Sequence, residues 1–163
     1  MASGNTLLTL FPLGYEPTST NYATLELRNS HPVLAFDTTT QESAIWTGIM
    51  PRHYAGGGIT VYIHWMAASA TSGTIGWDVS IERMSDATTD LDSDSFATAQ
   101  TVTAATVPGT TGVVSVTNVA ITSGANMDSL AAGESFRIRI RRDVTNDTAA
   151  GDAQLLAAEI KES

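Results

Sequence analysis

Residues 56–84 read GGGITVYIHWMAASATSGTIGWDVSIERM, two alternations of apolar and polar residues joined by a turn of small residues. A period of two is typical of a strand with one buried face, so this stretch predicts two neighbouring strands of a sheet. Trp65 and Trp77 are in phase with the aliphatic residues of their runs. We therefore expect both rings in a core, where aromatic side chains pair across strands, and not on an exposed sugar-binding platform. The apolar positions are Ile59, Val61, Ile63, Trp65, Ile75, Trp77, Val79 and Ile81.

The same alternation continues outward along the chain. Eight or nine short strands with turn signals between them, and few helical patterns, predict an all-β fold: an antiparallel β-sandwich of the jelly-roll type. Residues 153–161 contain Ala and Leu, which favour helix. We interpret them as a strand, because residues 134–142 need an antiparallel partner and residues 143–152 have the composition of a hairpin loop. The expected strands are 22–28, 31–37, 43–50, 58–67, 74–84, 101–107, 113–122, 134–142 and 153–161, with a single helical turn in 126–131.

The N-terminal segment is expected to be separate from the sandwich. Residues 1–20 contain two prolines and several apolar side chains, and they predict an extended N-terminal arm that precedes a sandwich domain of residues 21–163. Such an arm is either disordered or held on a neighbouring subunit. Four large apolar residues favour the second alternative and are the predicted interface residues of the arm: Leu7, Leu8, Leu10 and Phe11.

Composition limits the partners. The net charge is −9, and dense basic patches are needed to bind phosphates, so we expect no nucleic acid partner. The chain has no cysteine, which excludes disulfides and thiolate zinc sites. It has no apolar run of about eighteen residues, so no membrane partner is expected. The N-terminus lacks the basic and apolar regions of a signal peptide, which predicts synthesis in a cytoplasm.

The clearest charged pattern is ESFRIRIRR, residues 134–142. Arg137, Arg139 and Arg141 would line one face of a strand at intervals of about 6.6 Å. Two interpretations stay open for this row. The arginines pair with carboxylates on adjacent strands, such as Glu82 or Glu159, or they dock onto an acidic partner or a neighbouring subunit. Arg142 would add a fourth charge on the other face or beyond the strand end.

No motif predicts catalysis. The three histidines are scattered, there is no nucleophile elbow, and the glycines at 56–58 precede a strand instead of a helix. The stretch DATTDLDSDSF is similar to a calcium loop, but Ser95 and Thr101 stand where an EF-hand has Gly and Glu. Asp90, Asp92 and Asp94, in a loop that also contains Asp86, remain candidates for another type of calcium site. The chain is expected to be no enzyme, with no cofactor and no catalytic residue.

Four segments resemble small structural proteins of tailed bacteriophages: PRHYAGGGITVYIHWMAASATSG (51–73), WDVSIERM (77–84), DLDSDSF (90–96) and GANMDSLAAGESFRIRIRRD (124–143). This resemblance implies a virion component such as a capsid decoration protein or a head fibre. The first functional hypothesis is accordingly a non-enzymatic viral structural protein that decorates the capsid as a homotrimer. Its partners would be the major capsid protein or another virion protein, and its location the virion after synthesis in the host cytoplasm.

A second hypothesis is a receptor- or carbohydrate-binding module of a phage tail or fibre. It requires exposed aromatic residues, and the candidates are Tyr54, beside the glycine loop, and Tyr15. A third hypothesis, a hydrolase on a jelly-roll scaffold, requires paired carboxylates or a histidine metal site. The sequence offers neither clearly.

Overall fold

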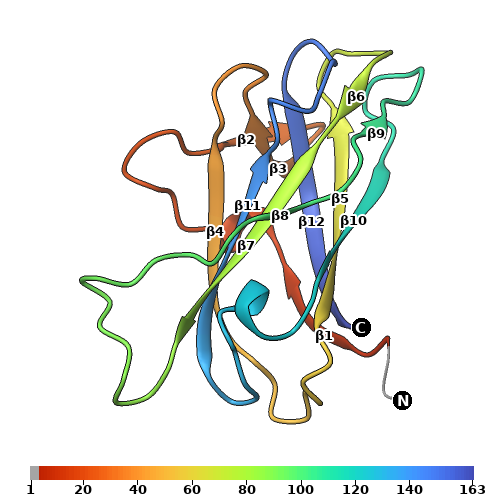
Figure 1. The fold of residues 1–163 in the computed structure, drawn as a ribbon. Coiled ribbons are helices and arrows are strands. Elements are labelled where there is room, and N and C mark those ends of the chain that lie inside the picture. The colour runs from red at the N-terminus through yellow and green to blue at the C-terminus, as the bar shows by residue number, and fades with distance from the viewer. Residues whose placement is uncertain (1–3) are drawn as a thin grey trace.

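The computed structural model describes residues 4–163, which form two antiparallel sheets packed face to face (Figure 1). Sheet A has the strand order β10-β5-β12-β3-β2, with β1 paired to β12, and sheet B has the order β4-β11-β7-β8. The strands of sheet A are β1 (Thr6–Leu10), β2 (Thr24–Arg28), β3 (His31–Phe36), β5 (Ile59–Ala67), β10 (Ser115–Ile121) and β12 (Ala153–Glu162). Those of sheet B are β4 (Ser43–Ile49), β7 (Trp77–Met84), β8 (Gln100–Thr101) and β11 (Ser135–Arg142). A separate pair consists of β6 (Thr74–Ile75) and β9 (Ala105–Thr106), and η1 (Pro12–Gly14) and η2 (Ala125–Met127) are short 3-10 helices.

The predicted antiparallel β-sandwich is confirmed, and every predicted strand range overlaps an observed strand. The range 74–84 is divided into β6 and β7 at Gly76. A Cβ at Gly76 would lie 3.2 Å from the carbonyl oxygen of Asp143, and the amide of Asp143 donates a 2.9 Å hydrogen bond to the Gly76 carbonyl. The chain of the 143–152 loop thus passes so close to residue 76 that a side chain there would have to displace it by a few tenths of an ångström.

The core lies between the two sheets and contains the apolar phase of residues 56–84. Trp65 and Trp77 are fully buried, with ring centroids 6.4 Å apart, and Trp77 meets Phe36 edge-on at 5.2 Å. The indole N–H of Trp65 donates a 2.8 Å hydrogen bond to Thr117 Oγ1. The prediction that both tryptophans are core residues is therefore confirmed. Aromatic pairs of this geometry stabilise a core by more than the apolar area that they bury.

The last strand has different partners from those predicted. Residues 153–162 do form β12, but β12 pairs with β5, β3 and β1 in sheet A, while the arginine strand β11 pairs with β4 and β7 in sheet B. The expectation that β12 forms a hairpin with β11 is wrong. The segment between them does not turn back along β11 but crosses from one sheet to the other.

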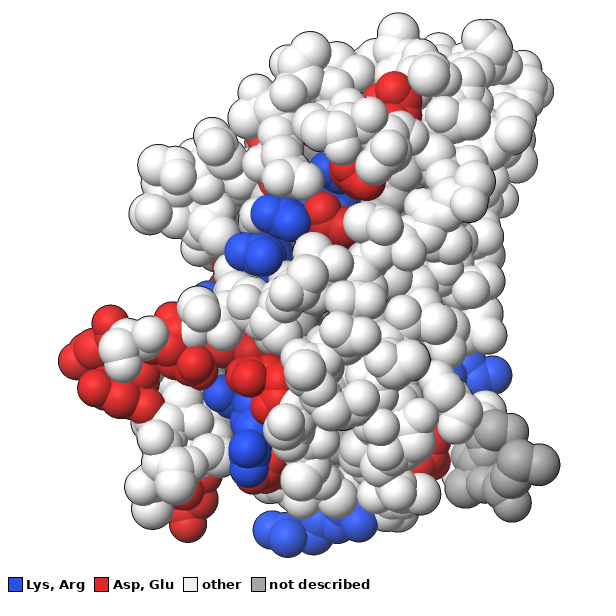
Figure 2. Space-filling view, viewed as in Figure 1, with Lys and Arg blue, Asp and Glu red and all other residues white. Residues whose placement is uncertain are grey.

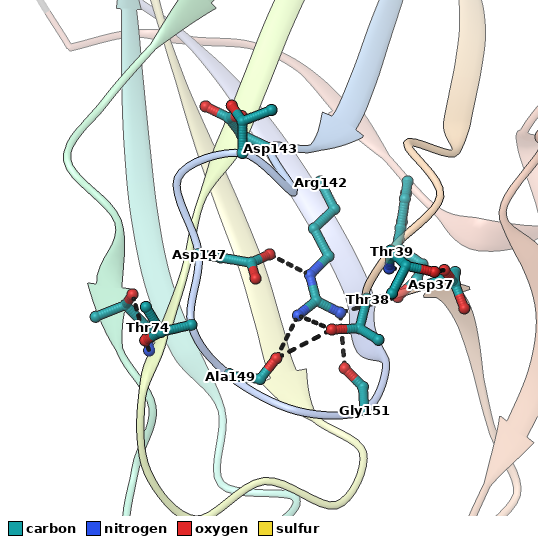
Figure 3. Close-up of polar contacts among 12 residues, drawn as sticks. Asp37, Thr38, Thr39, Thr74, Arg142, Asp143, Asp147, Ala149 and Gly151 are labelled. Atoms are coloured by element: carbon teal, nitrogen blue, oxygen red, sulfur yellow. Dashed lines mark hydrogen bonds and ion pairs between the residues drawn. The ribbon is translucent and has the colours of Figure 1, made fainter.

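Arg142 holds this crossing in place (Figure 3). Its side chain is fully buried at the end of β11, on the core side of the strand. All five N–H groups of the guanidinium find acceptors, so the charge and every donor are satisfied. The acceptors are Asp147 Oδ2 at 2.6 Å, the carbonyls of Gly151, Ala149 and Phe36 at 2.7, 2.9 and 3.3 Å, and Thr38 Oγ1 at 3.3 Å. Arg142 thereby joins the 143–152 loop to the end of β3.

The N-terminal segment lies on the sandwich of its own chain. β1 pairs antiparallel with the last residues of β12, and Leu7 and Leu10 belong to the core cluster. Leu8 packs partly buried against this cluster, and Phe11 is 59 % exposed. The expected boundary at residue 20 is therefore not a boundary between an arm and a domain, because an extended segment gains main-chain hydrogen bonds on β12 as readily as on another subunit. Within residues 4–163 no helix has the length and apolar character needed to span a membrane.

Candidate functional site

The outer face of sheet A carries a group of polar and aromatic side chains that reach solvent. These side chains come from strand positions that alternate with the buried ones on β5, β10 and β12. In the register of the sheet, Tyr62 stands between Asn118 and Glu159, and the neighbouring row places Thr60 beside Lys161. We call the group the Tyr62 face. Its members are Thr60, Tyr62, His64, Asn118, Glu159 and Lys161.

The ring of Tyr62 lies half-buried in the middle of this face. Lys161 Nζ is 5.6 Å from the ring centroid, a distance at which an ammonium group is attracted to an aromatic face. The diagonal neighbours Ala120 and Ala157 are short, so they do not rise beside the ring. A planar apolar surface with low surroundings can pack against another flat surface, such as the carbon skeleton of a sugar ring.

The polar groups around the ring are available for a ligand. Three of these side-chain groups make no hydrogen bond among the described residues: the Tyr62 hydroxyl, the His64 ring and the side-chain amide of Asn118. The Glu159 carboxylate accepts one from Thr6 Oγ1, and Thr60 Oγ1 lies 3.0 Å from Ser163 Oγ. An amide, an imidazole and a hydroxyl provide both donors and acceptors, which is what hydroxylated ligands require.

A cavity of about 320 Å³ lies at one end of the Tyr62 face. Met66 continues the outward phase of β5 into it, about 13 Å along the strand from Tyr62. Leu156 reaches it because the register of β12 shifts between Leu155 and Ala157, which adds one outward residue. The cavity is lined by Arg28, Asn29, His31, Met66, Thr111, Gly112, Val114 and Leu156.

A tight turn positions the polar wall of this cavity. Asn29 and Ser30, with φ of 45° and 66°, join β2 to β3. Positive φ at both central residues is typical of a type I′ hairpin, and Asn is one of the residues that adopt it most readily. The turn places Arg28 directly opposite His31, so that the two side chains enter the cavity from adjacent strands.

Sheet B places the arginine row on its outer face, as predicted, and pairs it with β7. Arg137 Nη1 is 3.2 Å from Glu82 Oε2, and Arg141 Nε is 2.8 Å from Asp78 Oδ1. Arg139 Nε donates to Ser80 Oγ at 3.1 Å. Glu82 is thus a partner, as one of the two interpretations expected. Glu159, named as another possible partner, lies in sheet A.

The segment after β7 covers part of the row. Phe96 packs its ring on Arg139, whose Cζ is 4.4 Å from the centroid, and Glu16 adds a second carboxylate 3.4 Å from Arg137. Figure 2 shows basic and acidic side chains side by side on the face it presents.

Burial raises the pKa of Asp78 although Arg141 opposes the shift, and burial lowers the pKa of Arg139. Contacts within one chain thus engage all three guanidinium groups of the row, two of them through carboxylates.

The tyrosines predicted as binding candidates are not free platforms. Tyr54 is 6 % exposed, and its hydroxyl accepts the Gly58 amide at 3.0 Å. The hydroxyl of Tyr15, which is half-buried, donates to the Ala23 carbonyl at 3.0 Å. Burial raises the pKa of both hydroxyl groups. Their selection was wrong because a sequence position beside glycines does not reveal whether a loop folds onto the core.

The acidic loop uses one of its carboxylates for its own turn. Asp90 Oδ1 accepts the amide of Asp92 at 3.1 Å, and the carbonyl of Asp90 accepts the amide of Asp94 at 3.0 Å. Local bonds of this kind are typical of Asx turns. Across residues 4–163, no three Asp, Glu or His side chains gather closely enough to hold a metal ion.

The sequence contained an unused signal for the Tyr62 face. The alternation that places Ile63 and Trp65 in the core places Tyr62 and His64 on the opposite side of the same strand. His64 was assigned to the polar face, but Tyr62 was passed over. The alternation excluded the tryptophans as exposed binding residues because it turns them towards the core. The same alternation would have selected Tyr62 as an outward aromatic residue.

No protein-family model and no curated protein matches this chain. Solved structures do resemble it. A family 35 carbohydrate-binding module from an environmental isolate has a TM-score of 0.54 at 12% identity, covering 94% of this chain and 92% of that module. The family 35 module of Cellvibrio japonicus Abf62 has a TM-score of 0.53 at 8% identity, with 95% and 92% covered. The second family 22 module, a xylan-binding domain, of Paenibacillus barcinonensis Xyn10C has a TM-score of 0.51 at 11% identity, with 96% and 99% covered.

These comparisons correct the resemblance to phage proteins. The three similar structures named above are carbohydrate-binding modules, and none of them is a virion protein. The bacteriophage family, the capsid-decoration role and the virion location predicted from the four sequence segments are therefore wrong. Those segments are the β-strands and loops of a jelly roll, and their alternation is a property of the fold. At these identities the likeness establishes the shared architecture alone.

Proposed function

We propose that this chain is a carbohydrate-binding module that holds a glycan on the Tyr62 face and catalyses no reaction on it. The observation that carries the proposal is the half-buried ring of Tyr62 on an open sheet, with the Lys161 ammonium beside it and the side chains of His64 and Asn118 making no hydrogen bond among the described residues. Similar structures described as carbohydrate-binding modules support it. Because a fold hosts many functions, the argument depends on the site and not on this likeness.

The chemistry of the face suits a hydroxylated ligand. The Tyr62 ring would stack on the apolar side of a sugar ring, while Asn118 and His64 exchange hydrogen bonds with its hydroxyls. These side chains lie on strands, which hold them more firmly than loops do. One aromatic platform with a few polar groups predicts modest affinity, because little apolar area is removed from water on binding.

The experiment is a calorimetric titration of the purified chain with soluble oligosaccharides, starting with xylo-oligosaccharides because one similar structure is described as xylan-binding. We expect Tyr62→Ala to weaken binding about tenfold, corresponding to roughly 1.4 kcal/mol for a lost aromatic contact. The matched control is Tyr22→Ala, which removes a tyrosine that is 47 % exposed and lies outside the Tyr62 face.

Three results would contradict the proposal or the place of its site. If the wild-type chain binds none of a broad panel of neutral and acidic oligosaccharides, the function is wrong. If it binds and Tyr62→Ala leaves the affinity unchanged, the function stands and the Tyr62 face is not its site. An equal loss in Tyr22→Ala would likewise exclude a specific role for Tyr62.

A further inference from the structure

Arg28 differs from the arginines of sheet B in how its guanidinium group is held. One nitrogen, Nη1, makes all of its contacts: it donates to the carbonyls of Ala67 and Ala68 at 3.3 Å and to Gln154 Oε1 at 2.7 Å. These acceptors belong to the end of β5 and the start of β12, so they fix the orientation of the group against the sheet. The remaining nitrogens, Nε and Nη2, donate to no acceptor among residues 4–163.

No carboxylate of the described chain neutralises Arg28, since no Asp or Glu oxygen lies within 4.0 Å of it. The acidic residue nearest to it on β2 is Glu26, whose carboxylate accepts the amide of Gln154 at 3.1 Å. Arg137 and Arg141, by contrast, each have a carboxylate partner, and Arg139 has none but donates to Ser80 Oγ and packs on the ring of Phe96. Arg28 thus keeps a charge with no carboxylate partner and two donor nitrogens without acceptors, whereas each outward arginine of sheet B donates to the neighbouring strand.

The unused nitrogens form the edge that recognises a carboxylate best. Nε–H and one N–H of Nη2 are parallel, and this pair matches the two oxygens of a carboxylate in a bidentate contact. Gly112 lies beside this edge. A Cβ there would be 2.8 Å from Nη2 and 3.1 Å from Nε, and the φ of Gly112 is +76°. The absence of a side chain at residue 112 therefore keeps the edge clear.

The surroundings of Arg28 form a site with both polar and apolar walls. Arg28 and Gly112 line the cavity of about 320 Å³ at the end of the Tyr62 face. His31 Nδ1 lies 3.2 Å from the Arg28 carbonyl, and when it donates there its Nε2 is left free on the opposite side of the ring. Met66 and Leu156 supply an apolar floor that continues from the outward phase of β5 and β12.

We propose that this cavity is a subsite for a carboxylate borne by the glycan, bound in bidentate fashion by Nε and Nη2 of Arg28. This inference rests on the proposed function, and it adds that the ligand is a chain carrying an acidic sugar. The overall negative charge repels a polyanion at long range, whereas a single carboxylate gains more from close contact with Arg28 than it loses by that screened repulsion. The ligand class is thus a largely neutral glycan with isolated carboxylates.

The test compares two matched ligands by calorimetry: a neutral xylo-oligosaccharide and the same oligosaccharide carrying one glucuronic acid. We expect the acidic ligand to bind the wild-type chain about tenfold more tightly, and Arg28→Lys to remove most of that preference. Lysine keeps the charge but lacks the planar pair of donors. The control is Arg52→Lys, an exposed arginine outside the cavity, which should keep the preference.

Nuclear magnetic resonance of the wild-type chain provides a readout that does not depend on the variant folding. The Arg28 Nε–H signal should shift with the acidic oligosaccharide and stay in place with the neutral one. A shift of the same size with acetate at equal concentration would overturn a glycan-specific subsite and identify a general carboxylate site. Equal affinity for both oligosaccharides would overturn the subsite and leave the proposed function standing. Binding of neither would overturn the function and this inference together.

Discussion

On sheet B each outward arginine has a hydrogen-bond partner on the neighbouring strand, whereas the Tyr62 hydroxyl and the Asn118 side-chain amide on sheet A have no hydrogen-bond partner among the described residues. The register explains the difference. It sets Arg137 opposite Glu82 and Arg141 opposite Asp78, so complementary groups are adjacent as soon as the sheet forms. On sheet A the same geometry sets Tyr62 beside Asn118, a pair with no mutual hydrogen bond.

The comparison teaches how to distinguish a structural charge pattern from a binding surface. Asp78 and Glu82 are 3 % and 5 % exposed, so their ion pairs belong to the interior of the molecule although they face outward from the sheet. Val116, on the open side of sheet A, is 51 % exposed. The alternating arginines of residues 134–142 are conspicuous in the sequence, but they lie on the face of sheet B, where they already have partners. The open face of sheet A is indicated in the sequence by one outward aromatic residue, Tyr62.

The largest effect is expected from breaking an ion pair of sheet B. Arg141→Met leaves the buried Asp78 carboxylate without its cation, which we expect to lower the free energy of unfolding by about 3 kcal/mol. Urea denaturation measures the loss, with Arg52→Met as the exposed control. Glycan affinity should not change. A fall in affinity with unchanged stability would reverse the roles assigned to the two faces.

A smaller loss is expected where the N-terminal segment joins sheet A. Leu10 on β1 is 8 % exposed and belongs to the core cluster, so Leu10→Ala should cost about 2–3 kcal/mol. Its neighbour Thr9 is exposed, and Thr9→Ala should stay within about 0.5 kcal/mol. Thermal denaturation of the two variants measures the difference. If both are neutral, the segment does not belong to the fold.

Sequence reasoning predicted the strands better than their pairing. The period of two depends only on one face being buried, and it correctly located β5, β7 and β11 from neighbouring residues. The partners of β12 depend on the path of the 143–152 loop. That path is fixed by the buried guanidinium of Arg142, and its five acceptors include Thr38 and the carbonyl of Phe36, far away in the sequence.

The site was less predictable than the fold, for a related reason. The outward direction of Tyr62 could be read from its phase, but the cavity beside Arg28 could not. It requires an I′ turn at Asn29, an extra outward residue at Leu156 and a glycine at 112, on three separate segments. Whether an arginine keeps a free edge is decided by which chains fold against it, and no local pattern encodes that.

A moderate effect is expected from uncovering the arginine row. Phe96→Ala removes the ring over Arg139, and a partly exposed cation–π contact is worth about 1 kcal/mol. Urea denaturation measures this loss, and faster solvent exchange of the Arg139 Nε–H would show that the guanidinium has become accessible. The exposed row should still bind no neutral oligosaccharide. Binding gained by this variant would mean that sheet B contains a site that Phe96 closes.

The smallest effect concerns a carboxylate at the end of the sandwich, outside both faces. The amides of Thr40 and Thr39 donate to Asp37 Oδ1 at 2.6 and 2.7 Å and lower the pKa of this carboxyl from 3.8 to about 2. Because the folded protein holds the proton less tightly than the unfolded chain, the unfolded chain binds more protons between these values. The stabilisation is complete above pH 3.8 and is lost as the pH falls towards 2.

Asp37→Asn keeps a side-chain oxygen that can accept the same amides and removes only the charge. The variant should therefore be slightly less stable than the wild-type chain at neutral pH, and the gap should close as the pH falls from 3.8 to about 2. Urea midpoints of both proteins across this range measure the gap, and subtracting them removes the titration of the other carboxylates. A constant gap would mean that the turn at Asp37 depends on hydrogen-bond geometry and not on charge. Glycan affinity at neutral pH should be the same in both proteins, because neither the Tyr62 face nor the Arg28 cavity includes this turn.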